Sequence, residues 1–169
     1  MSEADTIAKT DTPATVETLK RDLATLGVRQ GATLLVHSSL SSIGWVCGGA
    51  VAVIQALEAS LGEQGTLVMP AFSGGMTEPS HWQAPPVPET WWETIRTATP
   101  AYDPDFTPTR CMGQVAETFR TRPGVTRSDH PNVSFCAFGL NAQTITANHA
   151  LGLSFGEASP LARIYDFDG

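Results

Sequence analysis

Two histidines stand beside small polar or acidic residues, next to apolar runs. His37 precedes Ser38 and Ser39 where one apolar run ends, and His130 follows Asp129 shortly before another run begins. An imidazole that titrates near neutral pH can take a proton from an attacking group, and a neighbouring carboxylate can fix its tautomer. We therefore treat His37, His130 and Asp129 as candidates for proton transfer, with a hydrogen-bonded structural histidine as the alternative for each ring.

The segment around the first of these histidines reads as strand, loop and helix. Residues 33–36 (TLLV) form a short apolar run typical of a buried strand, and apolar residues recur at helical spacing over 50–61. Between them lie Gly44, Gly48 and Gly49, which let the backbone approach a ligand closely. Open α/β sheets bind ligands at the carboxyl ends of their strands, with anions often at the next helix N-terminus. The sequence therefore predicts chemistry in this loop.

Further apolar runs extend this pattern along the chain. Buried strands are predicted at 66–69 and 133–138, and helices at 15–26, at 112–119, after Asn141 and after Ser159. The first two strands and the helix between them form a βαβ unit, for which we expect a right-handed crossover. The fold class predicted is α/β, as a three-layer α/β/α sandwich around a mainly parallel sheet.

The expected domain organisation is simple. Residues 1–13 are polar and without periodicity, so we predict a disordered tail, followed by a single α/β domain over residues 14–169. Residues 166–169 resemble a turn that leads into another strand, and three strands are few for a sheet covered on both faces. We therefore expect the sheet to be incomplete at the C-terminus.

Residues 72–109 resist assignment to a regular element. They hold seven of the twelve prolines and three of the four tryptophans. Loops of this length in compact domains are usually binding loops, lids or disordered segments, and the aromatic content argues against disorder. Two interpretations stay open, a structural loop whose aromatic side chains pack on the core and a loop that covers a substrate.

Charge and composition exclude several classes of protein. The net charge of −7 argues against a nucleic-acid partner, because phosphate binding needs concentrated Lys and Arg. No Lys or Arg lies between Arg29 and Arg96, whereas five arginines fall between residues 96 and 127. One region could thus face a cation and another an anion, although charge counting alone favours ordinary solvated faces.

The chain lacks the sequence marks of a membrane or secreted protein. It has neither an apolar run of membrane-spanning length nor a secretory N-terminus. Three scattered cysteines form neither a disulfide framework nor a metal-binding pattern, so we expect reduced thiols, no metal and a cytoplasmic location.

Common catalytic motifs are also missing. The sequence has no G-x-S-x-G elbow, no G-x-G-x-x-G fingerprint and no P-loop lysine. From the residues alone, the chain is an α/β domain that binds a ligand or transfers an acyl or phosphoryl group.

Five stretches, in this order, carry a resemblance to a known family. They are LLVHSSLSSIGWVCGGAVAVIQAL, GTLVMPAFS, TPTRCMGQVAETF, RSDHPNVSFCAFG and HALGLSFGEASPLARIY, and they extend over nearly the whole chain. The chain resembles the aminoglycoside 3-N-acetyltransferases of the antibiotic acetyltransferase type. This resemblance implies acetyl transfer from acetyl-CoA, a co-substrate, to the 3-amine of a cationic 2-deoxystreptamine aminoglycoside, which confers antibiotic resistance.

The resemblance also implies roles for particular residues. Those expected at the CoA site are Ser38, Ser39, Leu40, Gly44, Gly48, Gly49 and Thr109. Glu157, Asp166 and Asp168 are expected to neutralise the cationic substrate, and His37 and His130 to transfer a proton or position the amine. Direct attack of the amine on the thioester needs no acyl-enzyme, so no nucleophile is assigned.

Members of this family are longer than the present chain, and the resemblance implies that a further strand and helix follow residue 169. Two alternatives therefore stand beside the leading interpretation. One is a related acyltransferase that acts on another amine, and the other is a catalytically incomplete chain that binds CoA. We expect a monomer or a homodimer that binds neither nucleic acid nor membrane.

Overall fold

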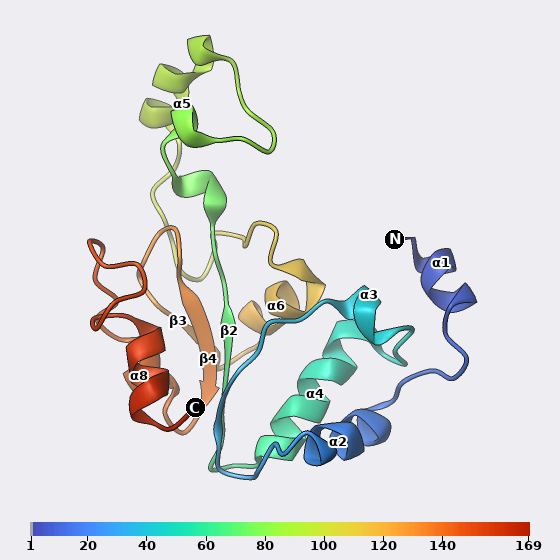
Figure 1. Cartoon of the computed structure of the whole chain (residues 1–169). Coiled ribbons are helices and arrows are strands. Elements are labelled where there is room, and N and C mark those ends of the chain that lie inside the picture. The colour runs from blue at the N-terminus through green and yellow to red at the C-terminus, as the bar shows by residue number, and fades with distance from the viewer. Residues whose placement is uncertain (1) are drawn as a thin grey trace.

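A four-stranded sheet lies between two layers of helices in the computed structural model, which describes residues 2–169 (Figure 1). The strands are β1 (Thr33–Leu35), β2 (Thr66–Pro70), β3 (Thr126–Arg127) and β4 (Phe135–Gly139), in the spatial order β1-β2-β4-β3. The three predicted strands are present, and the α/β class is confirmed. The two-residue strand β3 was too short to give a signal in the sequence.

The expectation of a mainly parallel sheet is wrong. β1 pairs with β2 in parallel, but β4 pairs antiparallel with both β2 and β3. The reason lies in the connection between β3 and β4, residues 128–134, which is shorter than the dozen residues that a parallel crossover needs. The chain therefore turns back directly, and the sheet is mixed.

Alternation along the central strands sends side chains to two separate cores. Leu67 and Met69 of β2 belong to one apolar cluster, while Val68 between them belongs to the other. On the first face lie α2 (Val16–Thr25), α4 (Gly49–Leu61) and α6 (Gly113–Arg120); on the second lie α7 (Ala142–Thr146) and α8 (Pro160–Asp166). This arrangement confirms the three-layer sandwich.

Two helices begin where the sequence gives start signals. Thr15 and Thr18 form a capping box at the start of α2, and Pro160 opens α8 after Ser159. The other helices are α3 (Leu40–Ile43) and α5 (Trp92–Ala98), with short 3-10 turns at Gly74–Met76 (η1), Pro79–His81 (η2) and Glu89–Trp91 (η3).

Residues 1–13 were predicted to be a disordered tail, but within the described residues 2–13 the chain forms a helix. Residues Glu3–Ala8 form helix α1. The helix begins with a capping box, in which the side chains of Ser2 and Asp5 accept hydrogen bonds from each other's backbone N–H groups. Thr10 then holds the segment to the body, because its Oγ1 accepts a 2.9 Å hydrogen bond from the N–H of Trp45. The Ser2-to-Asp5 spacing was the signal that the sequence offered for this helix.

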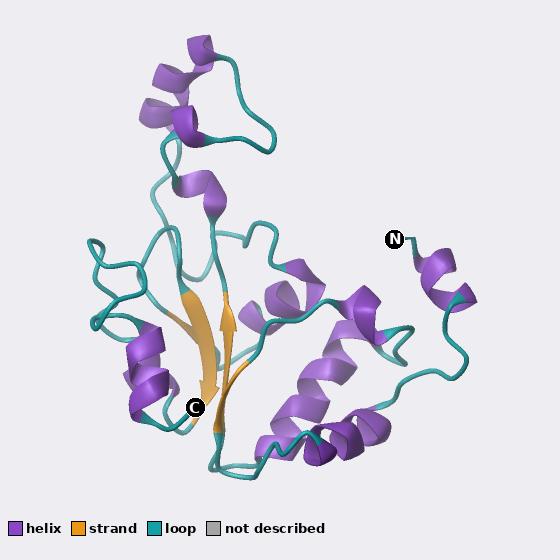
Figure 2. Ribbon diagram, in the orientation of Figure 1, coloured by secondary structure: helices purple, strands orange, loops and turns teal. Residues whose placement is uncertain are grey.

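Residues 74–103, here called the arm, leave the end of β2 and stand clear of the sheet (Figure 2). Helix α5 packs against η2 and η3, and Arg96 of α5 binds the carboxylate of Glu78 at 2.6 Å. Trp82 donates its indole N–H to Thr77, and Trp91 is 57% exposed. Trp82 also lies against Arg110, just beyond the arm, with 5.5 Å between the guanidinium and the ring centroid. Within residues 2–169 no tryptophan belongs to either apolar cluster, which argues against a loop that packs its aromatic side chains on the main core.

Candidate active site

A cavity of about 800 Å³ opens beyond the carboxyl end of β1. Three separate segments line it. They are Glu3 and Thr6 of α1, residues 38–41, 44–46, 48 and 49 of the loop before α4, and residues 111–114 at the start of α6. Because α6 lies about 65 residues beyond the loop, the fold and not the local sequence assembles this cavity.

Three helix N-termini meet at this cavity. Helices α3, α4 and α6 each begin among its lining residues, and within residues 2–169 no side chain caps their first N–H groups. At α4 the backbone is left-handed, with φ of +87° at Gly48 and +57° at Gly49. Helix N-termini carry partial positive charge and free N–H donors, so the cavity is suited to an anionic ligand.

Charged side chains around the cavity do not explain why it is suited to an anion. Among the lining residues of the described chain, Glu3 is the one with a formal charge, and the Trp45 indole N–H reaches its carboxylate at 3.5 Å. Attraction for an anion must therefore come from backbone N–H groups and from the hydroxyls of Ser38 and Ser39.

Six of the seven residues expected at a cofactor site line this one cavity: Ser38, Ser39, Leu40, Gly44, Gly48 and Gly49. Thr109 does not, because its backbone N–H points to Glu117 Oε2 at 2.9 Å. Thr109 instead fixes the chain just before residues 111–114. The contributions of α1 and of residues 111–114 were missed, since each comes from a distant part of the sequence.

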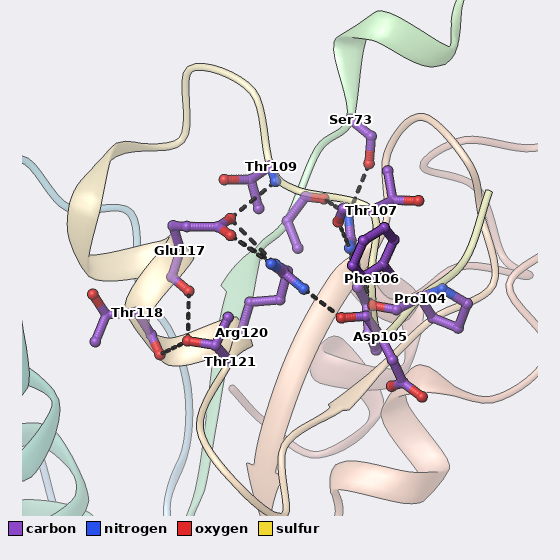
Figure 3. A network of polar contacts seen from close by, with 12 residues as sticks. Ser73, Pro104, Asp105, Phe106, Thr107, Thr109, Glu117, Thr118, Arg120 and Thr121 are labelled. Carbon is purple, nitrogen blue, oxygen red and sulfur yellow. Dashed lines mark hydrogen bonds and ion pairs between the residues drawn. The ribbon is translucent and has the colours of Figure 1, made fainter. Parts of the chain in front are cut away.

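Glu117 and Arg120 hold the segment that leads into the cavity (Figure 3). Arg120 donates hydrogen bonds to the Glu117 carboxylate from Nε, at 3.1 Å, and from Nη2. Its Nη1 donates to Asp105 O at 2.8 Å. Burial opposes ionisation of Glu117, but hydrogen bonds from Arg120 and Thr109 outweigh it and lower the pKa of Glu117 to about 2. The carboxylate thus joins α6 to residues 105–109.

Replacing Glu117 with glutamine should lower the free energy of unfolding at pH 7 by about 1 kcal/mol, since solvent screens part of the pair. The pKa of Glu117 is lowered on folding from 4.5 to about 2, so its stabilisation is present above pH 4.5 and lost as the pH falls toward 2. Urea unfolding at pH 7 and pH 3 measures the difference. The exposed Glu63→Gln variant is the control, and an equal effect of both variants would contradict the expectation.

His130 is buried, and its surroundings fix its tautomer. Its Nδ1 accepts hydrogen bonds from the backbone N–H groups of Asn132 and Val133, each at 3.2 Å. The neutral ring therefore carries its proton on Nε2, which is buried and has no partner within residues 2–169. In this state His130 offers a hydrogen-bond donor and no free lone pair, so it is suited to hold a group in place and not to act as a base.

His149 lies directly against His130, with 4.6 Å between the ring centroids. Its Nε2 donates to Ser154 O and its Nδ1 meets Ser128 Oγ, both at 3.0 Å, while Ser128 Oγ accepts from Phe135 N–H. No sequence signal pointed to His149, because its ring reaches His130 only through the folded loop after α7. Because Nε2 donates to a carbonyl oxygen, Nδ1 of the neutral ring accepts from the Ser128 hydroxyl.

Stability should fall at acidic pH because of His149. Burial lowers the pKa of His149 below 6.5, and the His130 ring adds to this, although the bond to Ser154 opposes it. Below pH 6.5 the unfolded chain therefore binds the proton more readily, and the free energy of unfolding declines with falling pH until the native ring also titrates. Chemical unfolding at several pH values should show a shallower decline for His149→Asn. Exposed His81→Asn should keep the wild-type slope, and equal slopes in all three proteins would refute the assignment.

The other two candidates for proton transfer, His37 and Asp129, do not form a group with the buried ring of His130. His37 is exposed just beyond β1, next to the cavity residue Ser38, whereas Asp129 is exposed and His130 beside it is buried. Nδ1 of His130 accepts from backbone N–H groups, and Nε2 has no partner within residues 2–169, so neither nitrogen bonds Asp129. An Asp129–His130 pair of the kind that would fix the tautomer of His130 is therefore not formed.

The three acidic residues predicted to face a substrate do not gather at the cavity. Asp166 pairs with Arg163 at 2.9 Å on α8, and Asp168 is next to Gly169, which lies against Thr33 at the amino end of β1. Glu157 lines a separate cavity of about 580 Å³ between α7 and α8.

Metal and thiol chemistry find little support in the described chain. Residues 2–169 contain no group of three His, Cys, Asp or Glu side chains placed to hold a metal ion. All three cysteines are free, and burial raises the pKa of the Cys136 thiol to about 12. Over the same residues, every helix is too short or too polar to cross a membrane.

Fold and cavity together define a three-layer α/β domain with a cavity suited to an anionic ligand. The model of the aminoglycoside 3-N-acetyltransferase family matches residues 35–169. The SPbeta prophage-derived aminoglycoside N(3')-acetyltransferase-like protein YokD of Bacillus subtilis is 51% identical over 160 residues, which are 94% of this chain and 59% of YokD. Aminoglycoside N(3)-acetyltransferase VII of Streptomyces paromomycinus is 37% identical over 170 residues, which are 100% of this chain and 58% of that protein.

Solved structures agree with the sequence relatives. The crystal structure of YokD from Bacillus subtilis matches with a TM-score of 0.93 and 50% identity, over 96% of this chain and 60% of that one. AAC-IIIb in a binary complex with CoASH matches with a TM-score of 0.79 and 34% identity, over 92% of this chain and 57% of that one. The chain belongs to the aminoglycoside 3-N-acetyltransferase family, and it spans about 60% of the length of the relatives that it matches.

Proposed function

We propose that this protein is an acetyl-CoA-dependent N-acetyltransferase that acetylates the 3-amine of 2-deoxystreptamine aminoglycosides and so confers resistance. The observation that carries the proposal is the cavity at which α3, α4 and α6 begin, in a member of this family. Its support from relatives is the solved complex of AAC-IIIb with CoASH and the activity in the names of the aminoglycoside N(3)-acetyltransferases.

In this proposal the N-termini of α4 and α6 hold the phosphates of CoA, and Gly48, Gly49 and Gly113 leave room for its extended pantetheine chain. When bound, acetyl-CoA supplies a thioester that an amine can attack. His37, exposed beyond β1, takes the proton that the substrate ammonium must lose. The Nε2–H of His130 donates to the substrate and positions it.

Two observations favour variants of this function. The chain covers 59% of YokD and 58% of acetyltransferase VII, which favours a CoA-binding chain whose catalysis needs further residues. The 51% identical relative is named acetyltransferase-like, which favours a different amine as the acceptor. The free cysteines fit a reducing compartment, so the proposal includes a cytoplasmic location.

Release of CoA thiol from acetyl-CoA, measured with gentamicin- and kanamycin-type drugs and without drug, tests the function. CoA binding to the same preparation is measured by calorimetry. Release that depends on the drug supports the proposal, and binding without release supports the incomplete CoA-binding chain. Neither binding nor release would contradict every version of the proposal.

A further inference from the structure

The N-terminal residues 2–12, here called the strap, form one wall of the cavity proposed for CoA. The strap contains helix α1, from which Glu3 and Thr6 line this cavity. Helix α1 has no buried residue, and its apolar side chain Ile7 is 53% exposed. In Figure 1 the helix stands at the edge of the molecule, clear of the sheet. The strap therefore shapes the cavity without belonging to either apolar core.

The strap is held by hydrogen bonds to the loop before α4. Thr10 Oγ1 accepts the Trp45 N–H at 2.9 Å and donates to Thr6 O at 2.7 Å. Just beyond the strap, Ala14 N–H donates to Trp45 O at 2.9 Å and Ala14 O accepts the Cys47 N–H at 2.8 Å. Segments held by few bonds and little apolar burial open first, so the strap is the part of the cavity wall best able to move, with Ala14 as its hinge.

A gap lies between the strap and α3. This second cavity, of about 460 Å³, is lined by residues 9–12 on one side and by residues 41–43 on the other. Well-packed protein interiors leave few voids larger than a water molecule. The strap and α3 are therefore not fixed to each other by close packing, and the strap has room to shift.

Glu3 brings a carboxylate to a cavity that is otherwise suited to anions. Among the lining residues of the described chain it is the one with a formal charge. It is held there by one long hydrogen bond, 3.5 Å from Trp45 Nε1 to Glu3 Oε1, and a bond of this length is weak. A phosphate that enters the cavity is repelled by this carboxylate, and little holds the carboxylate in place against it.

We propose that the strap is an autoinhibitory element of the cavity. Glu3 competes with the phosphates of CoA for the same space, and the strap must swing away about Ala14 for CoA to bind. The inference goes beyond the proposed function and rests on it only for the identity of the anion as CoA. Inorganic pyrophosphate, which carries the charge of the CoA bridge alone, is therefore the second probe.

Limited trypsin digestion tests the movement without any need for activity. Lys9 is the single Lys or Arg among residues 1–19, so cleavage after it reports release of the strap. CoA should raise the rate of cleavage after Lys9 about fivefold and change cleavage after the exposed Arg29 by less than about twofold. Pyrophosphate, compared with sodium chloride of equal ionic strength, should act in the same direction. An unchanged rate at Lys9, or protection of Lys9, with either ligand bound would overturn the proposal, since protection means a strap that closes over the anion.

Removal of the carboxylate tests its role in the competition. Glu3→Gln should tighten the binding of CoA in calorimetry about fivefold, because the phosphates no longer meet a like charge. Asp11→Asn is the matched control, since it makes the same change of charge on the strap at a residue that does not line the CoA cavity; its effect should stay below about twofold. The gain in Glu3→Gln should vanish at about 1 M salt, where the screening length falls to about 3 Å. A gain that persists there would mean a loosened α1, and no gain at low salt would mean no competition; either result overturns the proposal.

The two probes separate the strap from the proposed function. Binding of pyrophosphate with faster cleavage after Lys9, but no binding of CoA, would overturn the proposed function and support the strap. Binding of CoA without faster cleavage would overturn the strap alone. Binding of neither anion to the wild type would overturn both.

Discussion

Replacing Gly49 with asparagine is expected to weaken CoA binding at least thirtyfold, a loss of about 2 kcal/mol in binding free energy. Gly49 is the first residue of α4, and a Cβ built on it meets no atom of the described chain within 4 Å. The new side chain would project into the cavity where the proposal places the phosphates of CoA. Asparagine tolerates the left-handed backbone, with φ of +57° at this position, so the fold should be kept.

The matched control for this change is Gly27→Asn. Gly27 also has a positive φ, +92°, and open space around a built Cβ, but it follows α2 and does not line the cavity. Both variants should unfold within about 1 kcal/mol of the wild type. Calorimetric titration with CoA decides between them. Wild-type affinity in Gly49→Asn would mean that the anion site lies elsewhere.

The sequence predicted those parts of the fold that short segments determine. The apolar run 66–69 and the helical spacing of 50–61 specify β2 and α4 by themselves, and both are present. The direction of β4 depends on which neighbour it pairs with, and the run 133–138 carries no information about that. Helix α1 was predictable in principle, since its capping box lies within residues 2–5.

In the candidate site too, some residues could be predicted from the local sequence and others could not. The loop with Gly44, Gly48 and Gly49 was predicted because glycines between a strand and a helix are a local signal. Residues 111–114 could not be predicted to share a site with it, since only tertiary packing brings them there. The contact of His149 with His130 likewise depends on tertiary packing. The acidic candidates do not line this cavity, and the sequence could not show that, because the sign of a charge does not say at which end of the sheet it lies.

The second large effect is expected for a substitution of His130 that lowers the rate of acetyl transfer strongly but changes the free energy of unfolding little. His130→Asn keeps an acceptor in the position of Nδ1, so the N–H groups of Asn132 and Val133 stay bonded. The same change removes the Nε2–H, the buried donor that the proposal directs at the substrate. We expect acetyl transfer to drop about 100-fold, while the free energy of unfolding changes by about 1 kcal/mol.

His130→Ala provides the contrast, because it removes the acceptor as well as the donor. It should lower the free energy of unfolding by about 2–4 kcal/mol, since the buried N–H of Val133 and the partly buried N–H of Asn132 lose their partner and a cavity opens beside His149. Drug-dependent thiol release and urea unfolding, measured on both variants, separate the two contributions. If His130→Asn retained full activity, the Nε2–H would have no part in the reaction, and His130 would act only by closing the turn at residues 130–133.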